Sequence, residues 1–424
     1  MPSDYRTDST TGFIGLVKVN DDRLGRLEAR AAVEAASDAV AQHSTGWKLQ
    51  ILDGTHPFVI PVAVTYDRPP AERNFPDSVD LSKFLKSLPH PVALVADLML
   101  VPTPGHKGSG PAPHRHAFTR GDLDRVPVHV LAEPRPRISR RELESGRRPV
   151  LVLLDTKVQQ DPRQPHPWLQ SPGKELGDDA FWVDAATLGW DPGARLNPCP
   201  PLPPPPEREL GDGEGHGTFS AGLIRQVAPD VQVLAVQVIP DDGDVYGDHV
   251  LNALAWVGDE RVLAPGDVVC LPASFRPQLP TDNAFQNWLA EATLRLGDGV
   301  TLVAAAGNDG SDELVYPAAF TTWPKGSTAP TDSVGALNTD GGTKAYYSNF
   351  GDWVTAWEIG TSVVSAFPGI NGARAPELTS GDRRSTDPDD FTGGFARWSG
   401  TSFAAAVRAG KLAQQQLPAA SWER

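Results

Sequence analysis

Cysteine is nearly absent, because the 424 residues include only Cys199 and Cys270. Two cysteines cannot form a disulfide-stapled scaffold or a zinc site built from several thiolates. Free thiols are their simplest state, and a single bridge between them stays open. The first residues show no basic segment followed by an apolar core, so the sequence shows no secretory signal. No run of about 18 apolar residues occurs, which excludes a membrane-spanning helix. We expect a soluble, cytoplasmic protein.

Basic residues are too few to balance the acidic ones. Lysine and arginine number 38 and aspartate and glutamate 53, which gives a formal net charge of −15. Because phosphate binding needs clustered Lys and Arg, this balance argues against nucleic acid as the main partner. Hydrophobic residues make up 40% of the chain, enough to fill a sizeable core. The 41 prolines and 40 glycines predict many loops and turns.

Residues 1–132 predict an N-terminal α+β domain. Runs of apolar and β-branched residues are typical of strands, and they occur at 13–19, 47–52, 59–66, 92–100 and 128–131. An alanine-rich stretch between the first two runs favours a helix. No motif in this region specifies a function.

Residues 133–148 predict a linker between two domains. The segment contains six arginines and few apolar residues, a composition typical of an exposed connector. A docking or cleavage segment is the alternative interpretation. Either way, we expect the backbone of the segment to be accessible.

Residues 149–424 predict a second domain of the α/β class. Short apolar runs alternate with helical stretches, and runs that are apolar on both faces are typical of parallel strands covered by helices. We therefore expect a mostly parallel sheet with helices on both faces. Residues 159–210 interrupt this pattern as an insertion. It ends in a proline run that predicts exposed polyproline II structure.

Four polar residues stand at the ends of predicted strands or the starts of predicted helices: Asp155, His216, Asn308 and Ser402. Each alone is typical of a turn, a structural histidine or a helix cap. Together they supply what nucleophilic catalysis needs. A serine requires an imidazole base, the imidazole requires a carboxylate, and the oxyanion requires preorganised donors.

The sequence around these residues resembles the subtilisin-like serine proteases (subtilases). The matching segments are LVLLDTKV around Asp155, GHGTFSAG around His216, VAAAGNDG around Asn308 and SGTSFAAAVRAG around Ser402. The order Asp, His, Ser along the chain is the order of subtilisin. The resemblance extends over residues 149–412.

The resemblance implies a serine endopeptidase that hydrolyses peptide bonds through an acyl-enzyme. Ser402 would be the nucleophile, His216 the general base and then acid, and Asp155 the group that orients the histidine. The Asn308 amide would join the Ser402 N–H in the oxyanion hole. The implied partner is a peptide or protein substrate, and no cofactor is implied.

The resemblance also implies where the substrate binds. The strand at 269–274 and the segment at 304–307 would bound a groove in which an extended peptide pairs with exposed backbone. The implied substrate-binding residues are Leu271, Ala273, Ser274, Ala304, Ala305 and Gly307. The first segment reads CLPASFRP where the family usually has Ser-Leu-Gly, so the shape of the pocket stays open.

Several features depart from the family pattern. Lys157 takes the place of a glycine after the triad acid, and we expect its side chain to point to solvent. Only four residues separate Gly222 from Val227, too few for the family's calcium loop, so we expect an uninterrupted helix and no metal. The loop histidines His114 and His116 lack a third ligand and are expected to be solvated.

Two functional questions stay open at this stage. Many subtilases carry an N-terminal prodomain, and residues 1–132 are either such a removable inhibitor or a permanent regulatory or partner-binding domain. The alternative to an active peptidase is a pseudoprotease, a peptide-binding scaffold without useful turnover, which Lys157 and the unusual groove segment favour.

Overall fold

The structure is a computed structural model of the whole chain. It describes residues 12–19, 26–42, 47–52, 58–66, 78–96, 99–102, 126–128, 134, 147–159, 165–192, 210–211, 213–240, 245–259, 262–276, 282–371, 379–380, 383–384 and 389–417. His114, His116, Cys199, the proline run and most of the expected linker lie outside these residues.

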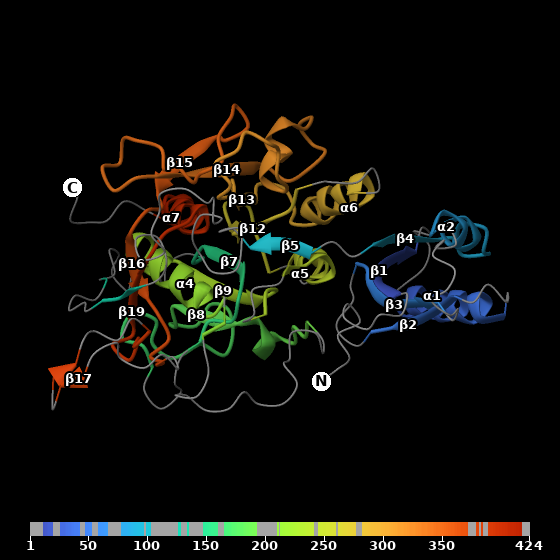
Figure 1. The fold of residues 1–424 in the computed structure, drawn as a ribbon, viewed down its shortest axis with the longest axis horizontal. Coiled ribbons are helices and arrows are strands. Elements are labelled where there is room, and N and C mark those ends of the chain that lie inside the picture. Colours follow the sequence, from blue (N-terminus) through green and yellow to red (C-terminus); the bar gives the residue numbers. More distant parts are fainter. Residues whose placement is uncertain are drawn as a thin grey trace.

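A seven-stranded parallel sheet forms the centre of the C-terminal half, as the sequence predicts (Figure 1). Its order is β15-β14-β13-β11-β7-β9-β8. The strands are β7 (Val150–Asp155), β8 (Trp182–Asp184), β9 (Gln232–Gln237), β11 (Val268–Leu271), β13 (Thr301–Ala305), β14 (Thr331–Leu337) and β15 (Ala356–Ile359). The insertion contributes β8, an edge strand that the sequence analysis does not anticipate.

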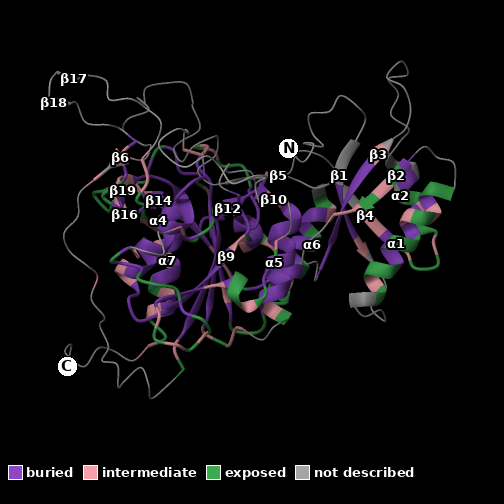
Figure 2. Ribbon diagram, turned by 90° about the horizontal axis from the view of Figure 1, so that it is seen from below, coloured by how far each residue is buried: buried purple, intermediate pink, exposed green. Residues whose placement is uncertain are grey.

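Strand β7 shows that both faces of the sheet are apolar. Val152 and Leu154 belong to one hydrophobic cluster, and Leu151 and Leu153 belong to a second. Alternate side chains of a strand point to opposite faces, so each face of the sheet has its own core. These cores fill the purple interior in Figure 2.

Helices cover both faces. Helices α5 (Gly247–Asp259) and α6 (Asp282–Leu294) supply the first cluster, and α4 (His216–Val227) and α7 (Thr401–Gln414) supply the second. The buried side of α7 after Phe403 consists of alanine and glycine. A Cβ at Gly410 would lie 2.6 Å from Val227, so α7 and α4 approach more closely than larger side chains would allow. Two short 3₁₀ helices, η2 (Ala185–Leu188) and η3 (Ala318–Thr322), complete this half.

The N-terminal region is an α+β unit with its own core, as the sequence predicts. Its elements are β1 (Gly12–Val19), α1 (Arg26–Gln42), β2 (Trp47–Ile51), β3 (Ile60–Tyr66), α2 (Ser78–Lys86) and β4 (Val92–Ala96). The strands form an antiparallel sheet in the order β2-β3-β1-β4. Val17, Val33, Val62 and Leu85 pack between the sheet and the helices.

Two short strands join the N-terminal region to the other half. Strand β5 (Met99–Pro102) lies antiparallel to both β10 (Val245–Tyr246) and β12 (Ala273–Ser274). Strand β6 (Val126–Pro127) pairs with β19 (Phe395–Trp398), whose other neighbour is β16 (Val363–Ala366). A further hairpin joins β17 (Thr379–Ser380) and β18 (Arg383–Arg384).

These short strands refine the sequence expectations. The run expected at 92–100 is divided into β4 and β5, and β6 precedes the strand expected at 128–131. Residues 126–127, which the sequence analysis places in the N-terminal domain, pair with a strand of the C-terminal half. Such edges form only when distant segments meet, so local patterns do not reveal them.

The N-terminal unit also rests on helices α5 and α6. Phe58 lies beneath two cations, with Lys18 at 4.7 Å and Arg295 at 4.8 Å from its ring centroid. Lys18 also forms an ion pair with Glu291 of α6. Val59 is fully buried and belongs to the cluster that contains α5 and α6. Leu16 and Phe58 belong to the same cluster, so the two halves share an apolar contact.

The last arginines of the expected linker are anchored. Arg147 forms a two-pronged ion pair with the buried Asp267 at 2.6 and 2.7 Å. Arg148 donates to the backbone carbonyls of Asp230 and Ala180. The C-terminal end of the segment is therefore fixed against the sheet. None of the helices that the structure describes combines the length and hydropathy needed to cross a bilayer.

Candidate active site

Asp155 and His216 form a buried hydrogen-bonded pair. Asp155 is the last residue of β7, His216 is the first of α4, and Nδ1 of the imidazole lies 2.7 Å from the carboxylate Oδ1. A carboxylate only accepts hydrogen bonds, so Nδ1 carries a proton, and in the neutral imidazole Nε2 then carries the lone pair. Nε2 is buried and has no hydrogen-bond partner among the described residues. It is therefore a base with a free acceptor position.

Thr156 fixes the spacing of this pair. Its backbone N–H donates to Asp155 Oδ1 at 2.6 Å, and its hydroxyl accepts the N–H of Gly217 at 2.8 Å. A Cβ at Gly217 would lie 2.1 Å from the Thr156 carbonyl oxygen. Only glycine allows the start of α4 to approach the end of β7 so closely. The sequence analysis does not identify Thr156, because its role depends on a contact across 61 residues.

Ser402 lies in the first turn of α7, and the residue after it, Phe403, packs against the imidazole of His216. The helix is preceded by Gly400 as its N-cap residue, so the serine is not a capping residue. Its hydroxyl donates to the Pro272 carbonyl at 3.2 Å. The rings of Phe403 and Trp398 lie 5.1 and 5.6 Å from that of His216, measured between centroids. These two aromatic side chains enclose the imidazole on the side of the helix.

Asn308 presents an unused donor to the same region. Its Oδ1 accepts from the Thr401 backbone N–H at 2.9 Å and from the Thr401 hydroxyl at 2.8 Å. A backbone N–H can only donate, so this contact fixes which end of the amide is oxygen. The Nδ2 group is buried and has no partner in the described part of the chain. The amide can therefore stabilise a developing negative charge.

The expected groove residues fall into two groups. Ala273 and Ser274 form β12 and pair with Pro102 and Val101 of β5, so the structure places them beside an extended segment. The others belong to the sheet or the turn that leaves it: Leu271, Ala304, Ala305 and Gly307. β10, which pairs with the other side of β5, could not be recognised in the sequence because it is only two residues long.

Two other groups near the site are chemically quiet. Cys270 is fully buried in β11, and burial together with the charge of Asp155 raises the pKa of its thiol. The thiol stays protonated and does not compete as a nucleophile. Lys157 is exposed, as expected from the sequence.

The described residues contain no cluster of histidine, cysteine and carboxylate side chains suited to a metal ion. Helix α4 continues from His216 to Val227 without interruption. The predicted continuous helix is therefore confirmed, and this part of the chain has no loop of the kind that holds calcium.

The chain is similar in sequence to known proteins. The model of the subtilase family matches residues 146–424. Subtilisin BL of Lederbergia lenta is 29% identical over 174 residues, which cover 39% of this chain and 58% of that protein. Subtilisin-like protease 2 of Pseudogymnoascus destructans is 32% identical over 171 residues, which cover 38% of each chain.

A solved structure of a cold-adapted subtilisin-like serine proteinase aligns with a TM-score of 0.40 and 19% identity. The alignment covers 64% of this chain and 76% of that one. The chain spans about half the length of the curated relatives it matches. The family model covers well over half of this chain, and the chain belongs to the subtilase family.

Proposed function

We propose that this protein is a serine endopeptidase that uses Ser402, His216 and Asp155 as a catalytic triad. One observation carries the proposal. His216 is bound through Nδ1 to a buried carboxylate at 2.7 Å, and its buried Nε2 has no partner among the described residues. Ser402 lies in the first turn of the helix whose next residue, Phe403, packs against the same imidazole. This is the arrangement that a hydroxyl nucleophile requires.

The reaction begins when the Ser402 hydroxyl turns from the Pro272 carbonyl towards His216. Serine Oγ attacks the substrate carbonyl carbon while its proton passes to His216 Nε2. Asp155 stabilises the imidazolium that forms. The carbonyl oxygen becomes an oxyanion, which accepts from Asn308 Nδ2 and from the Ser402 N–H in the first turn of α7.

The intermediate collapses when His216 returns the proton to the leaving amine, and the peptide C–N bond breaks. Ser402 is then esterified by the acyl group. Water attacks this ester with His216 again as the base, and the carboxylic acid product leaves. No cofactor takes part in this sequence.

The substrate binds as an added strand. β10 and β12 lie on either side of β5 and pair with it in antiparallel register, and an extended peptide can make the same backbone hydrogen bonds. Because β5 follows β4 of the N-terminal unit, we propose that this unit blocks the groove in the intact chain. Activity then requires β5 to withdraw or the unit to be removed.

A fluorophosphonate probe tests the enzymatic function. We expect the protein to be labelled covalently and Ser402→Ala to abolish the labelling while its melting temperature is retained. A matched control is Ser327→Ala, which removes an exposed hydroxyl bonded only to the Pro324 carbonyl among the described contacts. If neither the folded wild-type protein nor a folded variant without β5 is labelled, the peptide-binding scaffold is favoured instead.

A further inference from the structure

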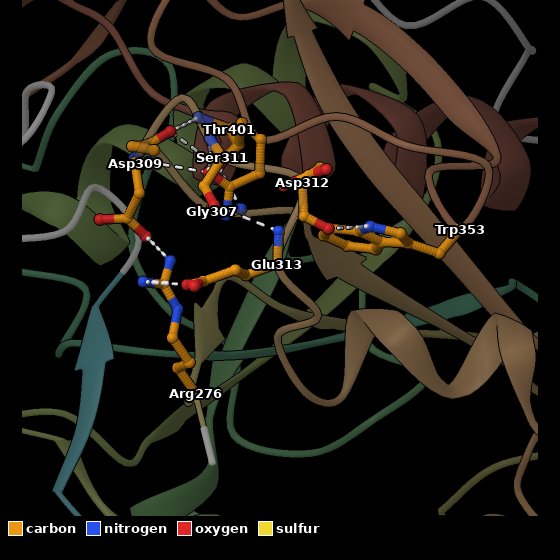
Figure 3. A network of polar contacts seen from close by, with 10 residues as sticks. Arg276, Gly307, Asp309, Ser311, Asp312, Glu313, Trp353 and Thr401 are labelled. Carbon is orange, nitrogen blue, oxygen red and sulfur yellow. Dashed lines mark hydrogen bonds and ion pairs between the residues drawn. The ribbon is translucent and has the colours of Figure 1, made fainter. Parts of the chain in front are cut away.

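Asn349 contacts the chain on both sides of Asn308. Its backbone N–H donates to the Gly307 carbonyl at 2.9 Å. Its side-chain Oδ1 accepts from the N–H groups of Asp309 at 2.9 Å and Ser311 at 3.1 Å. One fully buried residue therefore holds the residue before Asn308 and two residues after it. Figure 3 shows the three residues that it holds, Gly307, Asp309 and Ser311.

The close contact between Asn349 and Gly307 depends on the absence of a Cβ at position 307. Gly307 has φ +97°, and a Cβ there would lie 2.5 Å from Asn349 Nδ2. The Asn349 amide thus lies against the bare Cα of the residue before Asn308. Because both backbone N–H groups can only donate, Oδ1 must face them, and Nδ2 must face Gly307.

Further contacts fasten the rest of this loop. Arg276, just after β12, forms ion pairs with Asp309 at 3.0 Å and Glu313 at 2.6 Å. Their side chains are partly exposed, so water and salt weaken these pairs. The side chain of Asn349 is fully buried and its hydrogen bonds to Asp309 and Ser311 are partly buried, so solvent weakens them less than it weakens the ion pairs. Asn349 is therefore a fixed point of the loop that carries Asn308.

We propose that Asn349 is a positioning residue that holds the Asn308 amide in the oxyanion hole. This proposal rests on the proposed peptidase function. Thr401 sets the orientation of the Asn308 amide from the side of α7, and Asn349 sets the path of the backbone beneath it. Loss of Asn349 displaces the Asn308 donor relative to the oxyanion while Ser402, His216 and Asp155 stay in place.

A double-mutant cycle tests the proposal in the full chain. The readout is the second-order rate constant for fluorophosphonate labelling of Ser402, since the phosphonyl oxygen occupies the oxyanion position. We expect Asn349→Ala to lower this constant at least about tenfold. In an Asn308→Ala background the same substitution is expected to change it less than about twofold, because residues that act through one another are not additive. An equal loss in both backgrounds would overturn the proposal.

Two further variants make the cycle decisive. Asn338→Ala removes another side-chain amide, one that bonds Thr343 and Lys344 in an exposed turn, and it should leave the labelling rate unchanged. If Asn349→Ala does not fold, Asn349→Ser replaces it, because its hydroxyl keeps a polar group in the buried position but is too short to accept from both N–H groups. Unchanged labelling by a folded Asn349→Ser or Asn349→Ala protein would also overturn the proposal. Ser402→Ala separates the two hypotheses, because labelling that survives it would refute the peptidase function itself.

Discussion

The side-chain oxygen of Asn252 accepts a hydrogen bond from the backbone N–H of Phe58 at 2.9 Å. The same oxygen accepts from the Val59 N–H at 3.0 Å, and the amide nitrogen donates to the Val59 carbonyl at 3.0 Å. One buried amide of α5 thus serves three backbone groups of the N-terminal unit. A buried polar group left without such partners costs about 1–3 kcal/mol, so this residue contributes directly to docking.

Substitution of Asn252 by alanine should loosen the N-terminal unit and open the groove. We expect Asn252→Ala to label with a fluorophosphonate at least about fivefold faster than the wild-type chain, because a loss of about 1 kcal/mol in docking changes the open population by about that factor. Asn287→Ala, an exposed amide on the neighbouring α6, is the control and should label at the wild-type rate. A labelling rate unaffected by Asn252→Ala would mean that docking does not limit access.

Removal of the Asn308 amide should affect turnover far more than binding. We expect Asn308→Ala to lower kcat by about 10²–10³-fold with little change in KM, because one oxyanion donor stabilises the transition state by about 2.7–4 kcal/mol. Steady-state kinetics on a chromogenic peptide measure both constants. A fall of less than about threefold in kcat would place the oxyanion hole elsewhere.

A methyl group at Gly217 should separate the histidine from its carboxylate. Its Cβ would lie 2.1 Å from the Thr156 carbonyl, so the start of α4 must move away from β7. We expect Gly217→Ala to reduce kcat at least about 100-fold and to lower the melting temperature. Gly342→Ala is the matched control, because nothing lies within 4 Å of the added Cβ and its φ is ordinary. Wild-type kinetics for Gly217→Ala would contradict the tight approach.

His166 should make stability depend on pH. Its Nδ1 accepts from the Trp168 N–H at 3.1 Å and its Nε2 faces the Gly394 carbonyl at 2.7 Å, so the ring is neutral. Burial lowers its pKa below the usual value of 6.5. The unfolded chain therefore takes up a proton at a higher pH than the folded chain.

This difference in pKa makes the folded state less stable at low pH. The contribution of His166 to the free energy of unfolding is complete above the unfolded pKa of 6.5 and is lost as the pH falls below it towards the lower folded pKa. Denaturant unfolding at pH 7.5 and pH 5 measures the loss, and His166→Gln should reduce it. His90→Gln, which alters an exposed histidine, should not. Equal pH dependence in His166→Gln and the wild-type chain would exclude this histidine as the cause.

A chelator should leave the protein unchanged. Helix α4 is uninterrupted and the described residues offer no metal cluster. A saturated tight site adds RT ln(1 + [L]/Kd) to stability, so its loss would appear as a shift in melting temperature. We expect EDTA to change neither this temperature nor the labelling rate. A decrease that added calcium reverses would show that another segment supplies ligands.

The parallel sheet could be predicted because each buried strand is a local signal. Strands β7, β9, β11 and β13 are continuous apolar runs, and Asp155 ends one of them. The candidate site could be predicted for a related reason. Its polar residues interrupt apolar surroundings at strand ends and helix starts, where open parallel sheets place their sites.

The supporting contacts could not be predicted. Thr156, Thr401 and Asn349 are ordinary turn or cap residues in sequence, and their roles arise only when β7, α7 and the turn after β14 meet. The two-residue strands β10 and β12 are likewise too short to show an alternation of apolar and polar residues. They are strands because they pair with β5, which lies far from both in the sequence.

The position of β5 between β10 and β12 has a consequence for the order of synthesis. A ribosome completes the N-terminal unit and β5 first, and about 300 residues later it adds Ser402 at the start of α7. At about 5–20 residues per second, this interval lasts on the order of 15–60 seconds. On the proposed function, the occupant of the groove therefore exists before the nucleophile does, and a nascent chain has no period in which it can cleave its neighbours.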